Sequence, residues 1–504
     1  MIIKIGNNDN VGVLSEAIDF GYKDIQLNII ANELIEIGHK IALNDIPKGQ
    51  PIIKYNQIIG LASKDIYSGD KVHLHNVKIS HNQRLVKDST THFEELLSSN
   101  EFCETKREFN GYLRNDGKVG TRNYVGVMST VNCVSTIVRK ISSSFEDSIE
   151  NANIDGVAPI IHTLGCGHAI GKEGIEVLIK VLVGYISHPN YYSLLIVGLG
   201  CEDNQMSALL ERVPEIYKDK IKFLVVSDNG GTKETIIKGK KIVSSMLKKA
   251  SLERRSLQSV SHLNIALQCG GSDAFSGISS NPVLGHASDQ LIKLGGTSIL
   301  AETPEIYGAE HLIFNRMVSK ITVKKLQEKI DWWTKYLSSS DITFDANPSP
   351  GNKDGGLTTI NEKSLGSVSK SGYSKISDVI DYASPTYKNG LFIMDSPGYD
   401  PVSVTGQIAS GATIVCFTTG RGSAVGFKPS PCIKIGSNAN IYKAMPLDID
   451  FNCGTILDRT DSISNLGNQL FDLIIETASG RQTCSEIEDY GDNEFSPWQL
   501  GPVM

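Results

Sequence analysis

The stretch Leu263–Asp273, LNIALQCGGSD, decides the fold class of this chain. Its apolar first half is typical of a buried β-strand, and its second half is a short loop of glycines, a cysteine and an aspartate. In open α/β sheets, loops at the carboxyl ends of the strands face the ligand. The sequence therefore predicts a strand over 263–268 and a functional loop directly after it.

Four further loops repeat this arrangement of an apolar run followed by small residues. Three carry a cysteine, namely VNC at 131–133, GCGH at 165–168 and GCE at 200–202, and the fourth is TTGRG at 418–422. From about residue 109, strand candidates alternate with amphipathic helix candidates, which favours mainly parallel sheets with helices on both faces. We expect the five loops to surround one enzyme site that holds a metal.

Composition places the chain among large globular proteins. At 504 residues it is too long for one core, so we expect roughly two to four domains. A net charge of -7 argues against nucleic-acid binding, which needs a basic face. No apolar run reaches about 18 residues, so we expect no membrane span.

The N-terminus and the cysteines indicate the compartment. The first residues, MIIKIGNNDN, lack the basic and apolar regions of a secretory signal. The nine cysteines are scattered and form no CxxC pair, which indicates reduced thiols and a cytoplasmic protein. The sequence carries no clear interface signal, and a homo-oligomer stays an open alternative.

Changes of pattern divide the chain into four parts. Residues 1–80 contain short β-rich segments separated by Gly, Asn, Asp and Pro, which predicts a small all-β domain. Residues 81–108 are polar and weakly patterned, as in a linker. We expect one α/β domain over 109–350, which contains the cysteine loops, and another over 351–504.

The cysteine loops supply candidate metal ligands. A cysteine between a strand and a helix can lie at the helix N-terminus, where the helix dipole favours the thiolate, and thiolates bind iron or zinc. On this ground Cys166, Cys201 and Cys269 are candidate metal ligands, with Glu202 as a neighbouring carboxylate. The alternative is that these cysteines pack as small buried apolar side chains.

Two loops supply candidate catalytic and substrate-binding residues. Asp273 is a candidate base or metal ligand and Ser272 a candidate substrate contact, with helix capping as the alternative for both. Thr418, Thr419 and Arg421 are the main candidates for a carboxylate clamp, because hydroxyls and a guanidinium can hold a carboxylate together. The alternative for Arg421 is a structural salt bridge.

The stretch NPSPGNK at 347–353 is a polar, glycine-broken loop. It could present Asn347, Asn352 and Lys353 to a polyhydroxy ligand, or serve only as a connecting turn.

Histidines form the remaining candidates. His73 and His75, in HLHN, would share one face of a strand and could bind a metal together, with an unrelated surface pair as the alternative. His39 and His168 are candidates for proton transfer or metal binding.

Taken in order, these strings resemble the altronate and galactarate dehydratase family. The resemblance covers essentially the whole chain. It is carried by GHKIALNDIPKGQPIIKY, HLHN, GKVGTRNYVGV, TVNCV, HTLGCG, VGLGCEDNQ, QCGGSDAFSGISSNP, ETPEIYGAEHL, NPSPGNKDGGLTTINEKSLG, SPGYDPVSVTGQIASGA and FTTGRGS. It implies an N-terminal β-clip (SAF) domain followed by two α/β domains with mainly parallel sheets.

The resemblance also implies an activity. Members of the family remove water from a sugar acid to give a 2-keto-3-deoxy acid, with Fe²⁺ or a similar divalent metal such as Mn²⁺. The compact N-terminal unit and the HLHN string resemble the altronate branch, which implies conversion of D-altronate to 2-keto-3-deoxy-D-gluconate. Arg421 and the two threonines would then grip the carboxylate, while His39, His73 or His75 and the cysteine loops would hold metal or move protons.

Other functions remain open at this stage. The GCGH string departs from the family patterns, which leaves galactarate dehydration and sulfolactate-type β-elimination as alternatives. A hydro-lyase with an iron–sulfur cluster bound by three of Cys133, Cys166, Cys201 and Cys269 is a second hypothesis. A non-catalytic protein that binds sugar acids is the third.

Overall fold

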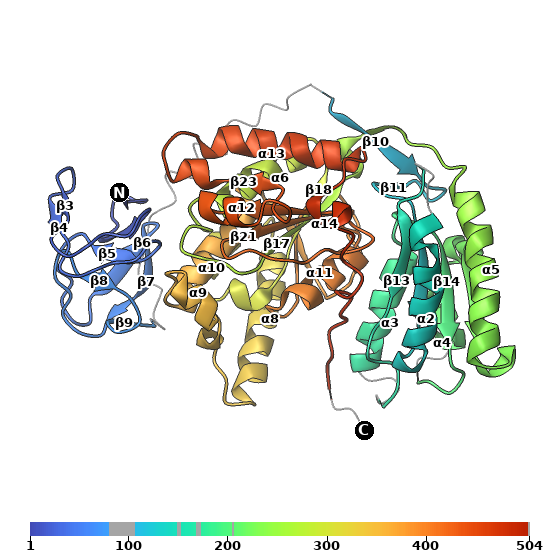
Figure 1. Ribbon diagram of the computed structural model, residues 1–504. Helices are drawn as coiled ribbons and strands as arrows, with labels where there is room; N and C mark the ends of the chain where they lie inside the picture. Colours follow the sequence, from blue (N-terminus) through green and yellow to red (C-terminus); the bar gives the residue numbers. More distant parts are fainter. Residues whose placement is uncertain (80–105, 149–152, 168–172, 204–205, 502–504) are drawn as a thin grey trace.

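The computed structural model describes residues 1–79, 106–148, 153–167, 173–203 and 206–501 (Figure 1). His168 and the predicted linker up to residue 105 lie outside the described residues. Within the described part of the chain, no helix is long and apolar enough to cross a membrane.

The N-terminal domain is built from short antiparallel strands, as the sequence predicts. One sheet has the order β1-β2-β5-β8, a second has the order β6-β7-β9, and β3 pairs with β4. Apolar side chains that alternate along these strands, such as Val11 and Ile52, point into the interior. The strands are β1 (Ile2–Ile3), β2 (Val11–Leu14), β3 (Lys23–Asp24), β4 (Ile29–Ile30), β5 (Lys40–Ala42), β6 (Pro51–Lys54), β7 (Gln57–Ala62), β8 (Lys71–Val72) and β9 (Val77–Lys78).

The second domain contains a four-stranded parallel sheet of order β13-β12-β14-β15. Helices α2 and α5 pack together over one face, and α3 and α4 cover the other. The chain enters and leaves this domain through a small antiparallel sheet of β10 (Glu108–Leu113), β11 (Val119–Gly120) and β16 (Ser256–Ser259). The main elements are β12 (Tyr124–Ser129), β13 (Gly156–Ile160), β14 (Tyr191–Gly198), β15 (Ile221–Val225), α2 (Ser135–Ser142), α3 (Glu173–Ile186), α4 (Met206–Arg212) and α5 (Thr232–Ala250).

The C-terminal domain contains a seven-stranded parallel sheet of order β19-β20-β18-β17-β21-β22-β23. The predicted boundary at 350 falls inside this sheet, because strands from both sides of that residue pair with one another. The strands are β17 (Asn264–Cys269), β18 (Thr297–Leu300), β19 (Ile376–Ile380), β20 (Gly390–Met394), β21 (Ile414–Thr419), β22 (Cys432–Gly436) and β23 (Phe451–Asn452).

Helices cover both faces of the seven-stranded sheet. Helix α13 packs on α6 at one face, and α11 packs on α3 of the second domain at the other (Figure 1). The helices are α6 (Ser280–Lys293), α7 (Glu310–Phe314), α8 (Lys320–Ser338), α9 (Pro350–Asp354), α10 (Ile360–Val368), α11 (Asp400–Ala409), α12 (Ala439–Ala444), α13 (Ile463–Ala478) and α14 (Cys484–Ile487).

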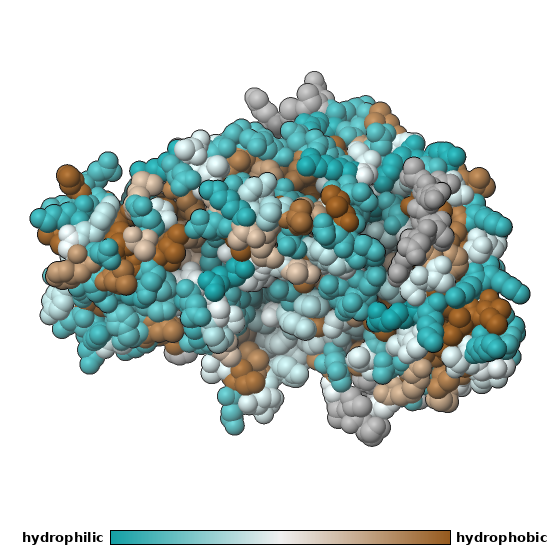
Figure 2. Space-filling model, in the orientation of Figure 1, coloured by the Kyte–Doolittle hydropathy of each residue, from teal (hydrophilic) through white to brown (hydrophobic). Residues whose placement is uncertain are grey.

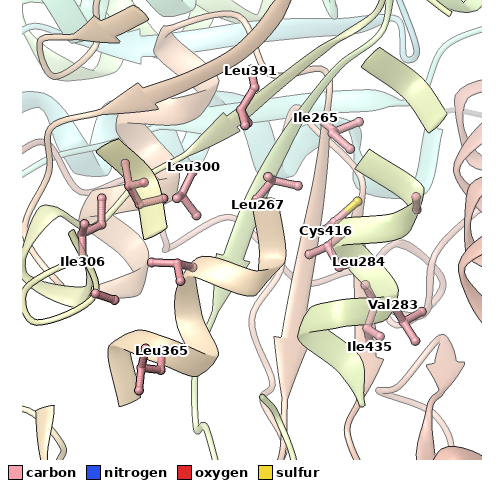
Figure 3. Close-up of a cluster of buried hydrophobic side chains, with 14 of the residues drawn as sticks. Ile265, Leu267, Val283, Leu284, Leu300, Ile306, Leu365, Leu391, Cys416 and Ile435 are labelled. Atoms are coloured by element: carbon pink, nitrogen blue, oxygen red, sulfur yellow. The ribbon is translucent and has the colours of Figure 1, made fainter. Parts of the chain in front are cut away.

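The core of the C-terminal domain is close-packed and apolar. Figure 3 shows Ile265 and Leu267 of β17 with Cys416 of β21, facing Val283 and Leu284 of α6. All five are fully or almost fully buried. Outside this core, the face in Figure 2 is mainly hydrophilic, with apolar patches scattered over it. The close-packed core holds the sheet rigid, and the sheet in turn holds the loops that leave its carboxyl edge.

Candidate active site and metal-binding clusters

The five loops divide between two sheets rather than one. The loops of Cys133, Cys166 and Cys201 follow β12, β13 and β14 of the second domain, whereas the loops at 269–273 and 419–422 follow β17 and β21 of the C-terminal domain. The five loops therefore leave two different sheets, because each set of strands pairs within its own sheet. Cys269 is thus on a different sheet from the other three cysteines.

The two loops of the C-terminal domain meet where the strand order of the seven-stranded sheet reverses. Strands β18 to β20 lie on one side of β17, and β21 to β23 lie on the other. The Gly270 N–H donates to the carbonyl of Thr418 (3.0 Å), and the Arg421 N–H donates to the carbonyl of Gly271 (2.9 Å). Such reversal points are where open α/β sheets bind their ligands.

Asp273 uses its carboxylate to build this edge. The carboxylate is buried and accepts hydrogen bonds from the Ser276 N–H (2.8 Å), the Ser437 hydroxyl (3.0 Å) and the Asn438 amide (3.1 Å). Burial raises the pKa of Asp273, and these hydrogen bonds oppose the rise. Asp273 caps the turn at 273–276, not a helix, and the geometry favours this structural role over a role as base. Ser272 does not cap the next helix, because Ser279 precedes α6.

The predicted carboxylate clamp is only partly available. The Thr418 hydroxyl donates to the Asn281 side chain (2.6 Å), and the Thr419 hydroxyl accepts the Gly422 N–H (3.0 Å), so both support the loops. Arg421 is exposed at the same edge. Of the three predicted residues, Arg421 is therefore the one placed to meet an anion from solvent.

A buried cluster of charges lies beside this edge. The Cys269 thiol is 3.6 Å from a carboxylate oxygen of Glu305, and the Lys370 ammonium is 2.7 Å from the same sulfur. Lys363 pairs with Glu305 at 2.6 Å, and Lys370 lies 3.8 Å from Glu302. Asp400, at the start of α11, accepts a hydrogen bond from Gln268 (3.1 Å).

The carboxyl groups of the cluster differ in their pKa values. Burial, with the charge of Glu305 beside it, raises the pKa of Glu302 well above its usual range. Burial opposes ionisation of Glu305 too, but the ammonium groups of Lys363 and Lys370 outweigh it and lower the pKa. Burial and the charge of Glu305 raise the pKa of Asp400 to about 6. One carboxyl is thus held neutral, one is ionised, and the pKa of the third lies just below neutral pH.

The backbone at Glu302 supports a functional interpretation. This residue has a φ of 68°, a left-handed conformation that non-glycine residues rarely adopt, and its N–H donates to the Ser396 hydroxyl (2.9 Å). Such strained residues concentrate at functional sites.

Cys269, Glu302 and Glu305 also have the spacing of a metal site. One ligand atom from each lies within 4.8 Å of the others, and all three residues are buried. One oxygen of Glu302 is buried without a hydrogen bond, which a cation would satisfy. Without a metal, the Lys370 ammonium is the positive charge in contact with the Cys269 sulfur. A bound divalent ion would replace the ammonium in this contact. The donor set therefore fits a divalent metal.

The loop at 347–353 contributes one residue to the cluster. The Asn347 amide donates to Glu305 (3.1 Å), and its oxygen accepts from Lys363 (2.6 Å). Asn352 instead forms a capping box with Ser349 at the start of α9. Its side chain also donates to the Ser272 carbonyl (2.8 Å). Lys353 is half-buried and its side chain lies apart from these contacts.

The predicted histidine pair is not formed on a strand. Strand β8 ends at Val72, and residues 73–76 make a turn in which the Asn76 side chain accepts the His73 N–H (2.9 Å). His75 is exposed, whereas His73 stacks on His39 with ring centroids 4.7 Å apart. Burial lowers the pKa of His73 to about 3. The turn separates His73 from His75, and the stacked pair His39–His73 replaces it.

His39 lies where the N-terminal domain meets the C-terminal domain. Its Nδ1 is 2.9 Å from Glu36, and its Nε2 is 3.3 Å from the carbonyl of Asp354. Beside it, the fully buried Glu362 of α10 binds Lys40 and Lys54 of the N-terminal domain, each at 2.9 Å. This contact attaches the N-terminal domain next to the buried cluster.

Sequence reasoning missed most of the buried cluster. Glu305, Lys363, Lys370 and Asp400 were not candidates. One signal was available. Lys363 and Lys370 are seven residues apart, about two helical turns, in a stretch otherwise made mainly of small and apolar residues.

Three parts of the chain each match a domain of known proteins. Residues 1–80 match the altronate/galactarate dehydratase SAF domain. Residues 111–251 match the second domain of D-galactarate dehydratase/altronate hydrolase, and residues 260–503 match the C-terminal part of D-galactarate/altronate dehydratase. The chain is 34% identical to an altronate dehydratase of Bacillus subtilis (strain 168), over 97% of both chains.

Two further relatives come from Escherichia coli (strain K12). An altronate dehydratase is 34% identical over 97% of both chains. A galactarate dehydratase (L-threo-forming) is 35% identical over 99% of this chain and 97% of its own. By its three matched domains and these full-length relatives, the chain belongs to the altronate/galactarate dehydratase family.

Proposed function

We propose that the chain removes water from a sugar acid, converting D-altronate to 2-keto-3-deoxy-D-gluconate. The observation that carries this proposal is the full-length similarity to two altronate dehydratases, 34% identical over 97% of each chain. The galactarate dehydratase is similar to the same degree, so galactarate is the second candidate substrate. A small sugar acid is the expected partner, in a cytoplasmic enzyme that is monomeric or a homo-oligomer.

The buried cluster supplies the groups that this reaction needs. Dehydration removes the weakly acidic proton at C2, next to the carboxylate, and then expels the C3 hydroxyl. Asp400, with its pKa near 6, is suited to take the C2 proton at neutral pH. Glu302 is neutral in the absence of a cation, and binding of the proposed metal would release its proton, so it would serve as a metal ligand.

The two lysines stabilise the charge that develops on the substrate. Loss of the C2 proton moves negative charge onto the carboxylate, and fixed cations in a water-excluded site stabilise that charge strongly. Lys363 and Lys370 are buried and paired with Glu305 and Glu302, which supports this role. Arg421, exposed at the rim, would attract and orient the incoming carboxylate.

Access to the cluster requires the loops to open. A cavity of about 10 Å³ touches Cys269, Ser272 and Lys363 and has room for about one water molecule. A sugar acid therefore enters only when the loop after β17 separates from α10. This closed arrangement would exclude water during the reaction.

Fe²⁺ or Mn²⁺ is the proposed metal. Cys269, Glu302 and Glu305 would hold it, since a thiolate and two carboxylates suit Fe²⁺. When bound, the metal supplies Lewis acidity to a substrate oxygen.

The test is an assay of the purified protein prepared anaerobically with Fe²⁺ or with Mn²⁺. D-altronate, galactarate and sulfolactate are offered separately, and 2-keto-3-deoxy acid or sulfite is detected. Keto acid from D-altronate supports the proposal, and keto acid from galactarate alone moves the substrate. Sulfite release from sulfolactate alone, or no product from any acid by folded protein, would overturn it.

A further inference from the structure

The second domain carries a separate group of thiols at the carboxyl edge of its sheet. Cys133, Cys166 and Cys201 follow β12, β13 and β14, three adjacent strands of the parallel sheet. All three are exposed, whereas the other described cysteines are buried or half-buried. Cysteine is among the most buried residue types, so three exposed cysteines on neighbouring loops are unusual.

Backbone hydrogen bonds join the three loops. The Asn132 N–H donates to the Leu164 carbonyl (3.1 Å), which joins the first loop to the second. The Asp203 N–H donates to the Gly165 carbonyl (3.0 Å), which joins the second loop to the third. Each bond lies within two residues of a cysteine, so the thiols are held on one connected platform.

Glu202 reinforces this platform instead of acting as a metal ligand. Its buried carboxylate accepts the Thr130 hydroxyl (2.7 Å) and the Gly200 N–H (2.6 Å). It therefore ties the end of β12 to the end of β14. A buried carboxylate that fixes cysteine loops is an arrangement built for precise placement of the thiols.

The thiols are close, but not as close as ligands of a single ion. Cys133 and Cys201 are both near enough to Cys166 to interact electrostatically with its thiol. However, the three sulfurs are not all within 4.8 Å of one another, a spacing that Cys269, Glu302 and Glu305 do meet in the described residues. An iron–sulfur cluster suits this wider spacing, because each thiolate binds a different iron.

We propose that Cys133, Cys166 and Cys201 bind an iron–sulfur cluster at the carboxyl edge of the second domain. A four-iron cluster held by three protein thiolates keeps one iron open to an oxygen ligand. The exposed position of the thiols leaves room for such a ligand. The proposal concerns this second site only and does not depend on the activity proposed for the C-terminal domain.

The test is reconstitution of the full-length protein with Fe²⁺ and sulfide under anaerobic conditions. We expect a broad absorption near about 400 nm and about four sulfide ions per chain, with about four iron ions in addition to the single Fe²⁺ proposed at Cys269, Glu302 and Glu305. Each of Cys133→Ser, Cys166→Ser and Cys201→Ser should remove most of the absorption and bound sulfide. Cys269→Ser and Cys484→Ser are matched controls that should retain both.

A second measurement avoids variants that fail to fold. Two samples of the wild-type protein are compared, one without reconstitution and one after it. Iodoacetamide should label all three thiols in the first sample, and the bound cluster should protect them from labelling in the second. Loss of absorption only in Cys269→Ser would overturn the proposal. Absence of bound sulfide would also overturn it, even if Zn²⁺ or iron alone binds. Unchanged labelling of the three thiols after reconstitution would overturn it as well.

Discussion

The contact between Glu362 and its two lysines makes the sharpest prediction about stability. Glu362, Lys40 and Lys54 are fully buried, and the Thr358 N–H and hydroxyl donate to the same carboxylate at 2.9 and 2.7 Å. The two ammonium groups outweigh the effect of burial and lower the pKa of Glu362 far below its usual range. The change to test is Glu362→Gln, which keeps the shape and removes the charge.

The expected magnitude follows from the loss of compensation. Glu362→Gln leaves two buried ammonium groups without a counter-charge, and breaking a buried pair in this way costs about 3–5 kcal/mol. The effect depends on pH with a definite sign. A carboxyl with a lowered pKa stabilises the fold above its unfolded pKa and loses that contribution in acid, so variant and wild type should converge as the pH falls below 4.5.

Urea unfolding measures this effect. All three tryptophans lie in the C-terminal domain, so their fluorescence reports its unfolding. Glu36→Gln is the matched control, because Glu36 pairs with Lys71 at the surface and should contribute only about 0–1 kcal/mol. Replacing all three buried residues by Met and Leu should restore much of the stability. The reasoning fails if Glu362→Gln costs no more than Glu36→Gln.

Three further predictions concern the charged and thiol groups. Asp400→Asn should raise the melting temperature more at pH 7.5 than at pH 5, because a raised pKa of about 6 makes ionisation in the folded protein unfavourable; a pH-independent difference would contradict this. In metal-free protein, iodoacetamide should label Cys133 and Cys201 before Cys269, which is buried with its pKa raised to about 11; earlier labelling of Cys269, seen by peptide mass spectrometry, would refute it. Arg421→Ala should raise KM by roughly tenfold or more through loss of a charged hydrogen bond, and near-normal steady-state kinetics would exclude the clamp role.

Local pattern predicted the elements well because it reflects burial of individual segments. The expected strand over 263–268 is β17, and the expected small β-domain, alternating strands and helices, and parallel sheets are all present. Which strands pair depends on contacts between distant segments. The sequence therefore could not show that β17 and β21 share a sheet that excludes β12 to β14.

The site was harder to predict than the fold. Lys363 and Lys370 are fully or largely buried. From sequence alone a lysine is predicted to be exposed to solvent unless its partner is known. His73 and His75 alternate as residues on one face of a strand do. In the structure they lie in a turn that the Asn76 side chain caps. Asp273 matched both a base and a cap, and the choice depended on Ser437 and Asn438 from a strand end far along the chain.

The most direct test of the central claim is a comparison of dehydration rates in the buried cluster. D-altronate is incubated with wild-type protein, Asp400→Asn, Glu302→Gln and the exposed control Glu328→Gln, and keto acid is followed by NMR. Loss of the proposed base or of a proposed metal ligand should lower kcat by about 100-fold or more in the two cluster variants and leave the control unchanged. Wild-type kcat in both cluster variants would place the chemistry elsewhere and contradict the account.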